Sequence, residues 1–154
     1  MVDTQPGIRS QLLNLLSMRE HSQKELMDKL SAKSLSAEAI TKEIIYLQEI
    51  GLQSDARFAA AFARMRVRQG KGPLIINQEL LSKGISKELI IDTINELDIE
   101  WEQLARETRE RKFGEEIPVE PKLKAKQLRF LAGRGFNASQ AYAAIAASCD
   151  NDGY

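Results

Sequence analysis

The sequence predicts an all-α protein in which one three-helix unit occurs three times in tandem. The first observation is a set of apolar positions that recurs after fifty and then fifty-one residues. Its members are Ile40, Ile44 and Leu47, then Ile90, Ile94 and Leu97, then Ala141 and Ile145, with Leu30, Leu80 and Leu131 in the preceding helices. Stacked helical repeats of this kind mostly present surfaces to other macromolecules.

The second observation is a short break after each of the three matched leucines. The breaks are Ser34-Leu35-Ser36, Gly84-Ile85-Ser86 and Gly135-Phe136-Asn137. Each ends in a residue whose side chain can accept a hydrogen bond from the free amides of a following helix. No segment has the alternation of a strand or the turn of a hairpin, so helices account for the whole pattern.

The first unit is predicted from its helix starts and stops. Apolar residues at helical spacing predict a helix over residues 8–19. Ser22 is expected to cap the next helix, because Glu25 can return a hydrogen bond to the amide of the cap. Ser36 begins the third helix, and Gly51 suits the left-handed conformation that ends it.

The second unit opens with a helix from Ser54 that is expected to bury Phe58, Phe62 and Met65. Gly70-Lys71-Gly72-Pro73 interrupts the chain, and its proline suits the first position of a helix. An anion could meet the exposed amides of that helix. The two helices that complete the unit are expected over residues 74–83 and 86–97.

The third unit repeats this arrangement with one insertion. Trp101, Ala105 and Thr108, on a helix expected over 99–113, take the places of Phe58, Phe62 and Met65. Residues 114–120 contain a Gly, a Pro and glutamates, which predicts an inserted surface loop. The expected units are therefore residues 1–52, 53–98 and 99–148, followed by a frayed tail at 149–154.

The charge is balanced overall but unevenly distributed. The 154 residues include 22 basic and 22 acidic side chains, and 29% are charged, a globular composition. The segments 57–71 and 122–134 each contain five basic residues and no acidic residue. Such segments indicate an anionic partner, whereas the alternative is a solvated helix face that binds nothing.

Two cationic stripes follow from helical spacing. Arg57, Arg64 and Arg68 fall within about 40° of one another on a helix of 100° per residue. A second stripe, similar to the first, consists of Lys122, Lys126 and Arg129. These residues and Lys71 are the candidate partner-binding residues, and their chemistry suits carboxylates and phosphates alike.

No catalytic, cofactor-binding or metal-binding residue is predicted. His21 is the only histidine, and its position beside a capping serine indicates a surface residue rather than a base. Cys149 is the only cysteine and is expected to be a reduced thiol of a cytosolic protein. No apolar run approaches the roughly 18 residues of a membrane span.

Four segments carry a resemblance to a known family. They are His21-Ser22-Gln23-Lys24-Glu25-Leu26 with Lys29-Leu30, Asp55-Ala56-Arg57-Phe58-Ala59 with Phe62, Gly70-Lys71-Gly72-Pro73 with Gln78-Glu79-Leu80 and Lys83-Gly84-Ile85, and Leu128-Arg129-Phe130-Leu131 with Arg134-Gly135-Phe136. In this order they resemble the bacterial RecX family, the regulators of the RecA recombinase. Leu52 and Gln53 depart from the family's common aromatic and aliphatic pair, and Ala141 replaces a larger aliphatic residue, so a thinner core is expected there.

The resemblance implies an elongated, curved array of three-helix units that binds the RecA filament and inhibits it. Such a protein obstructs filament growth and lowers the ATPase, strand-exchange and co-protease activities of RecA. It needs no cofactor and belongs to DNA repair, homologous recombination and the SOS response in the cytoplasm. We expect a monomer, with single- or double-stranded DNA inside the filament as a further candidate partner.

A second hypothesis is a sequence-neutral DNA-binding protein that acts on the strand itself. Three-helix units can resemble helix-turn-helix domains, and both stripes could then contact phosphates. Binding of this kind weakens steeply as salt rises, which distinguishes it from filament binding.

Overall fold

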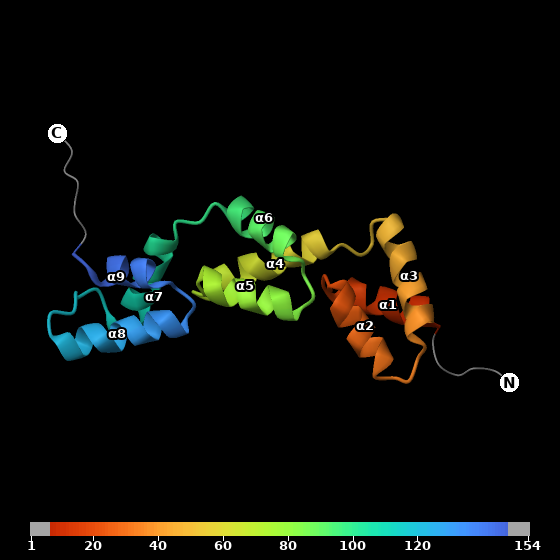
Figure 1. Cartoon of the computed structure of the whole chain (residues 1–154), viewed down its shortest axis with the longest axis horizontal. Helices are drawn as coiled ribbons and strands as arrows, with labels where there is room; N and C mark the ends of the chain where they lie inside the picture. Colours follow the sequence, from red (N-terminus) through yellow and green to blue (C-terminus); the bar gives the residue numbers. More distant parts are fainter. Residues whose placement is uncertain (1–6, 148–154) are drawn as a thin grey trace. The chain divides into compact units, whose positions relative to one another are not determined.

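The computed structural model describes residues 7–147, and these residues form nine helices and no strand (Figure 1). The helices are α1 Ile8–Met18, α2 Gln23–Ser31, α3 Ala37–Glu49, α4 Asp55–Arg68, α5 Pro73–Ser82, α6 Lys87–Leu97, α7 Trp101–Phe113, α8 Pro121–Gly133 and α9 Ala138–Ile145. The all-α prediction is confirmed. Cys149 and the predicted frayed tail lie outside the described residues.

The chain divides into two compact units. The first contains the residues through Ala63 together with Glu79–Glu96, and the second contains Arg64–Gln78 and the residues from Leu97 onward. Helices α4 and α5, and α6 through its last residue Leu97, therefore contribute residues to both units. The boundaries expected between the three repeats, after residues 52 and 98, stay predictions.

The first unit has its apolar core among α1, α2 and α3, which contact one another (Figure 1). Six side chains are fully buried there: Leu12, Leu26, Leu30, Ile40, Ile44 and Leu47. Full burial of one such side chain stabilises the fold by about 1.5–3 kcal/mol. The repeated apolar positions of this unit, Leu30, Ile40, Ile44 and Leu47, are therefore core positions.

The predicted helix ends in this unit are confirmed. Ser22 accepts a hydrogen bond from the Glu25 amide and donates its own amide to the Glu25 carboxylate, which completes a capping box. Ser36 accepts from the amide of Ala39 at the start of α3. Gly51 follows α3 with a φ of 78°, the left-handed conformation that glycine adopts without a steric cost.

The joint between α3 and α4 is polar. Gln53 is 2% exposed, and its Nε2 donates to the carbonyl oxygen of His21 at 3.1 Å and to Asp55 Oδ1 at 3.0 Å. Asp55 Oδ1 also accepts from the Gln23 amide at 2.8 Å. Hydrogen bonds thus connect the start of α4 to the start of α2.

The buried face of α4 differs from the prediction at Met65. Phe58, Ala59 and Ala63 are buried, whereas Met65 is 36% exposed. At 100° per residue, Met65 lies about 120° around the helix from Ala59. The buried face is thus centred on the alanines, and Phe58 marks its edge.

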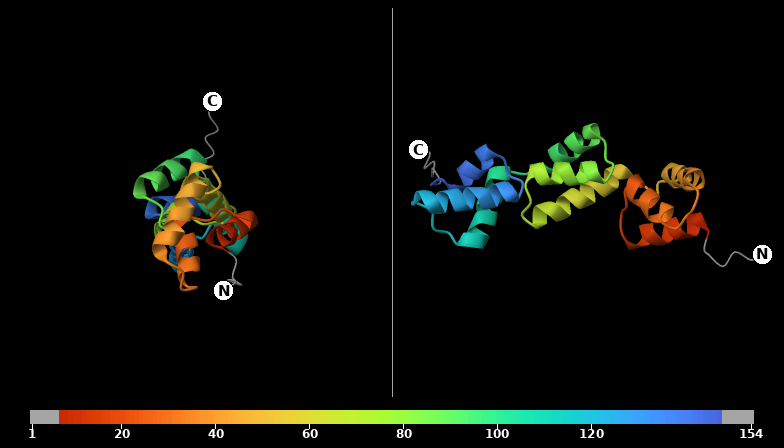
Figure 2. Two further views of the ribbon diagram at one scale, coloured as in Figure 1. Left: turned by 90° about the vertical axis from the view of Figure 1, so that its right-hand side faces the viewer. Right: turned by 60° about the horizontal axis from the view of Figure 1, so that its bottom comes forward.

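The second unit has its core among α7, α8 and α9, with α8 and α9 in blue in Figure 2. The buried residues are Ala105, Leu131, Phe136, Ala141, Ala144 and Ile145. Partly buried side chains pack around them, including Trp101, Leu104, Leu128 and Phe130. Ala141 is a core residue here.

The predicted loop at residues 114–120 is present and is fixed to the helices by Arg109. Arg109, 1% exposed, donates from Nη1 to the carbonyl oxygens of Gly114 at 3.3 Å and Glu116 at 3.1 Å. Its Nε donates to the carbonyl of Ala144, in the last turn of α9, at 2.8 Å. Pro118 is buried, so the loop is not wholly a surface feature.

The Gly70–Pro73 turn packs directly against the start of the loop before α9. The Gly72 amide donates to the Arg134 carbonyl at 2.8 Å, and the Leu74 amide donates to the Gly135 carbonyl at 3.0 Å. A Cβ on Gly72 would overlap the carbonyl oxygen of Gly135. Pro73 is the first residue of α5, as predicted, but Gly135 occupies the place where an anion was expected.

Candidate anion-binding surfaces

The first predicted stripe lies on α4, and its three arginines differ in their contacts. All three are exposed. Arg57 forms an ion pair with Glu20, with Nε 3.0 Å from Oε1, and donates from Nη2 to the Gly51 carbonyl at 2.8 Å. Within the described chain, Arg64 and Arg68 have no ion-pair partner. They are therefore the members of this stripe that a partner could bind without breaking an existing contact.

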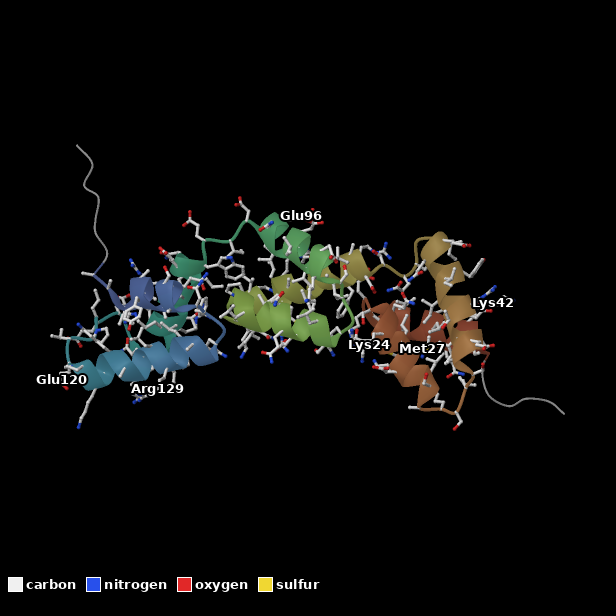
Figure 3. All side chains as sticks on the ribbon, in the orientation of Figure 1. Lys24, Met27, Lys42, Glu96, Glu120 and Arg129 are labelled. Atoms are coloured by element: carbon white, nitrogen blue, oxygen red, sulfur yellow. The ribbon has the colours of Figure 1, made fainter. Side chains whose placement is uncertain are left out.

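The second predicted stripe lies on α8. Lys122, Lys126 and Arg129 are all exposed, and Arg129 extends away from the helix in Figure 3. The Lys126 ammonium lies 5.9 Å from the centroid of the Phe113 ring, within the range of a cation–π contact. Lys71 is half-buried in the turn before α5.

A third group of cations surrounds a cavity of about 350 Å³ in the second unit. This α7–α8 cavity is lined by Thr108, Arg111, Lys112, Phe130 and Arg134. The Arg134 guanidinium carbon lies 5.6 Å from the centroid of the Phe130 ring, and Lys112 Nζ lies 6.0 Å from it. Two of the three lining cations, Lys112 and Arg134, thus lie over one aromatic ring.

Arg111 and Lys112 of the α7–α8 cavity are not among the candidate binding residues predicted from the sequence. Arg111 and Lys112 follow Glu107 and Glu110 on α7, so a search for segments without acidic residues passes over them. Two consecutive cations in the last turn of a helix were the available signal. Their proximity to Arg134 depends on how α7 packs against α8.

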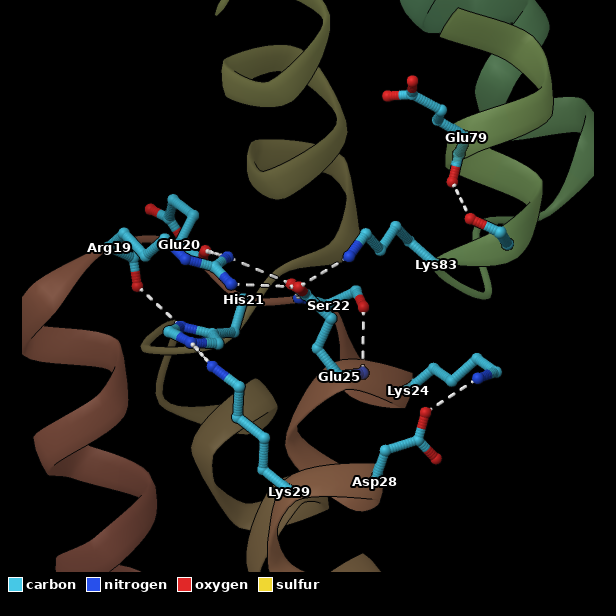
Figure 4. Close-up of polar contacts among 11 residues, drawn as sticks. Arg19, Glu20, His21, Ser22, Lys24, Glu25, Asp28, Lys29, Glu79 and Lys83 are labelled. Atoms are coloured by element: carbon cyan, nitrogen blue, oxygen red, sulfur yellow. Dashed lines mark hydrogen bonds and ion pairs between the residues drawn. The ribbon is translucent and has the colours of Figure 1, made fainter. Parts of the chain in front are cut away.

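The carboxylate of Glu25, in the first unit, has a lowered pKa. Figure 4 shows the residues around it. Its Oε2 lies 3.0 Å from Arg19 Nη2 and 3.3 Å from Lys83 Nζ, and its Oε1 accepts from the Ser22 amide at 3.1 Å. Burial raises the pKa of Glu25, but the hydrogen bonds from Arg19 and Ser22 and the two cationic charges outweigh it. The resulting pKa is about 2, so the carboxylate stays ionised.

His21 is buried at 1% exposure, so the prediction of a surface residue was wrong. Its Nδ1 lies 3.0 Å from the Arg19 carbonyl oxygen, and its Nε2 lies 3.0 Å from Lys29 Nζ (Figure 4). These contacts fit a neutral ring that donates from Nδ1 and accepts at Nε2. Burial lowers the pKa of His21, and the charges of Arg19 and Lys29 lower it further.

His21, two residues before α2, uses both ring nitrogens in contacts within the protein, so its role is structural. Among residues 7–147, no three His, Cys, Asp or Glu side chains group in a way that could hold a metal ion. Within the same range, no helix has the length and apolar character needed to cross a membrane. The exposed arginines and lysines of α4 and α8 have side chains that can bind anions.

Family models of one protein family match three successive parts of the chain. Models of the first, second and third three-helix domains of RecX match residues 9–47, 54–93 and 98–145. The regulatory protein RecX of Halorhodospira halophila is 37% identical, over 95% of this chain and 91% of its own length. A Pseudomonas putida protein of the same name is 38% identical, over 88% and 87%.

Solved structures agree with these sequence matches. A crystal structure of a regulatory protein RecX superposes with a TM-score of 0.74 at 25% identity, covering 88% of this chain and 68% of that chain. The RecX structure from Lactobacillus salivarius gives a TM-score of 0.71 at 24% identity, covering 90% and 92%. The second comparison supports the fold alone.

Proposed function

The chain belongs to the RecX family of regulatory proteins, and from this premise we propose that it binds the filament of RecA on DNA and inhibits it. Binding blocks extension of the filament and lowers its recombinase, ATPase and co-protease activities. The protein acts as a monomer in the cytoplasm, in DNA repair and the SOS response. The observation that carries this proposal is the match of all three RecX domains in order along the chain.

The exposed cations supply the contacts that this function needs. We assign partner binding to Arg57, Arg64, Arg68, Lys71, Lys122, Lys126 and Arg129. A filament offers repeated carboxylates and phosphates, and both suit guanidinium and ammonium groups. Arg57 lies in one compact unit and the other six residues lie in the second. Several modest contacts on one chain raise the total affinity well above that of each contact.

Inhibition by binding requires no covalent chemistry. The only histidine has both ring nitrogens in contact with Arg19 and Lys29, which leaves it unsuited to act as a general base. The relatives are named regulatory proteins, in agreement with a role that needs no catalytic residue.

A pull-down against two forms of the recombinase tests the proposal. The purified chain is immobilised and presented either with RecA assembled on single-stranded DNA or with DNA-free RecA. We expect retention of the assembled form in preference to the DNA-free form. Loss of retention from both forms would contradict the proposal, and retention of naked DNA alone would favour the DNA-binding alternative.

A further inference from the structure

The α7–α8 cavity combines positive charge with an absence of competing carboxylates. Arg111, Lys112 and Arg134 line it, and no acidic residue is among its lining residues. Two acids on α7 have other contacts: Glu107 accepts from Gln103 Nε2 at 3.3 Å, and Glu110 lies 3.7 Å from Arg109 Nη2. The charge of the cavity is therefore not neutralised by its own lining.

The guanidinium of Arg134 has an unsatisfied donor. Its Nε is enclosed and has no hydrogen-bond partner among the described residues. A buried donor without a partner costs free energy, and a charged donor costs more. An oxyanion that entered the cavity could reach the guanidinium after a small movement of this side chain and satisfy it.

An aromatic ring accompanies these cations. Phe130 lines the cavity, and Phe113 packs edge-on against it with ring centroids 5.2 Å apart. This contact fixes the orientation of the Phe130 ring, while Arg134 adds a guanidinium that bases can also stack on. Cations beside a fixed aromatic ring are the usual composition of single-strand binding sites.

The turn before α5 brings a fourth cation to this part of the second unit. A Cβ on Gly70 would lie 2.9 Å from Thr108 Oγ1, and the Gly72 amide donates to the Arg134 carbonyl. The backbone of Lys71 is therefore placed between residues that contact Thr108 and Arg134. A strand that left the cavity would meet further positive charge at this turn.

The size of the cavity favours a nucleotide over a single carboxylate. Pockets that hold small molecules occupy about 300–1,000 Å³, and this one has about 350 Å³. A carboxylate of an acidic protein would use the cations but would leave the ring of Phe130 unused. A nucleotide offers both an anionic phosphate and a flat base.

We propose that the α7–α8 cavity binds one nucleotide of a single-stranded nucleic acid. The phosphate contacts Arg111, Lys112 and Arg134, and the base lies against Phe130. Bases in a duplex are stacked and paired, so a single strand binds more tightly than a duplex. This inference goes beyond the proposed function, because the cavity shares no residue with the two stripes and its test requires no recombinase.

Fluorescence anisotropy of a labelled oligothymidylate with the full chain tests this site. We expect the double variant R111A/K112A to lose at least tenfold in affinity. The slope of log affinity against log salt should become shallower by about 0.7, because about 0.7 of an ion is released for each phosphate contact in single strands and the cavity holds one phosphate. The variant F130L should lose about fivefold or more, with the slope unchanged.

Matched controls keep the outcome interpretable. K42A/K87A removes two exposed lysines of the first unit and should leave the affinity unchanged. Circular dichroism melting checks that each variant is folded. Wild-type affinity in folded R111A/K112A, or no preference of the wild type for a single strand over a duplex, would overturn the assignment. Reduced filament inhibition with unchanged DNA affinity would also overturn it, in favour of an acidic protein ligand.

Discussion

Lys83 Nζ lies 3.3 Å from Glu25 Oε2, although 58 residues separate the two in the chain (Figure 4). This ion pair joins α2 to the residue that directly follows α5, within the first compact unit. Arg19 contacts the same carboxylate at 3.0 Å. One glutamate thus caps α2, pairs with the end of α1 and connects to the second repeat.

Replacement of Glu25 by glutamine should destabilise the protein by about 2–3 kcal/mol. The fall of its pKa from 4.5 to about 2 corresponds to about 3 kcal/mol, reduced somewhat because Arg19 and Lys83 are partly exposed. Glutamine keeps the capping box, so the change isolates the charge. Urea unfolding at pH 7 measures the loss. As a control, D28N should change stability by less than about 0.5 kcal/mol, because its pair with Lys24 is exposed.

Acid should destabilise the protein through Glu25. Its pKa is lower in the folded state, so the stabilisation is fully present above about pH 4.5 and is lost as pH falls toward about 2. Unfolding free energies measured from pH 6 to pH 2.5 should decline more in the wild type than in E25Q. Equal declines of the unfolding free energy in the two proteins would contradict the lowered pKa of Glu25.

His21 should titrate below its ordinary pKa of 6.5. It is the only histidine, so its ring proton resonances can be followed by NMR without ambiguity. Because the folded pKa is lowered, the neutral ring contributes stability above about pH 6.5, and that contribution falls as pH decreases below it. The variant K29M should raise the pKa partway toward 6.5, since burial remains the larger cause. A pKa at or above 6.5 in the wild type would contradict the buried, neutral ring.

Replacement of Gly72 by alanine should destabilise the second unit by at least about 2 kcal/mol. The added Cβ would overlap the Gly135 carbonyl and lie 2.7 Å from the Phe136 amide nitrogen, so the backbone must shift. Gly133 is the matched control, because a Cβ there has no neighbour within 4 Å. G133A should be neutral or stabilising by up to about 1 kcal/mol. Equal unfolding midpoints for the two variants would contradict the close packing at Gly72.

The helices were predictable because their signals are local. The spacing of Leu26, Leu30, Ile40 and Ile44 depends only on helical geometry, and these positions are buried. The capping box at Ser22 likewise involves residues three positions apart. Helix starts and core positions could therefore be read from the sequence.

The errors concern features that depend on packing. Met65 has helical spacing from Phe58, but the buried face of α4 is the one that carries the small side chains of Ala59 and Ala63. His21 is buried because hydrogen bonds from Lys29 and to Arg19 satisfy its ring. A position beside a helix cap suggested exposure, and no local signal indicated these partners.

The same limit applies to the candidate sites. The two stripes are visible in the sequence because each lies on one helix. The α7–α8 cavity combines α7 with α8, and acidic residues intervene along α7. A search for basic segments finds the first kind of surface and misses the second.

Loss of the free arginines of α4 should weaken filament inhibition. R64A/R68A removes two exposed charges without breaking an ion pair of the described chain, whereas removal of Arg57 also breaks its pair with Glu20. We expect at least a fivefold rise in the concentration that halves the RecA ATPase activity. K42A/K87A, with the same change in charge, should behave as the wild type. Equal inhibition by both double variants would remove the α4 stripe from the interface.

The central claim is that the chain inhibits RecA by binding its filament. The most direct measurement is ATP hydrolysis by RecA on single-stranded DNA, titrated with the purified wild-type chain. The account predicts a progressive fall in hydrolysis as the chain binds, with co-sedimentation of the chain and the filament over the same concentrations. Undiminished hydrolysis at a large excess of folded chain, with no chain in the filament pellet, would contradict it.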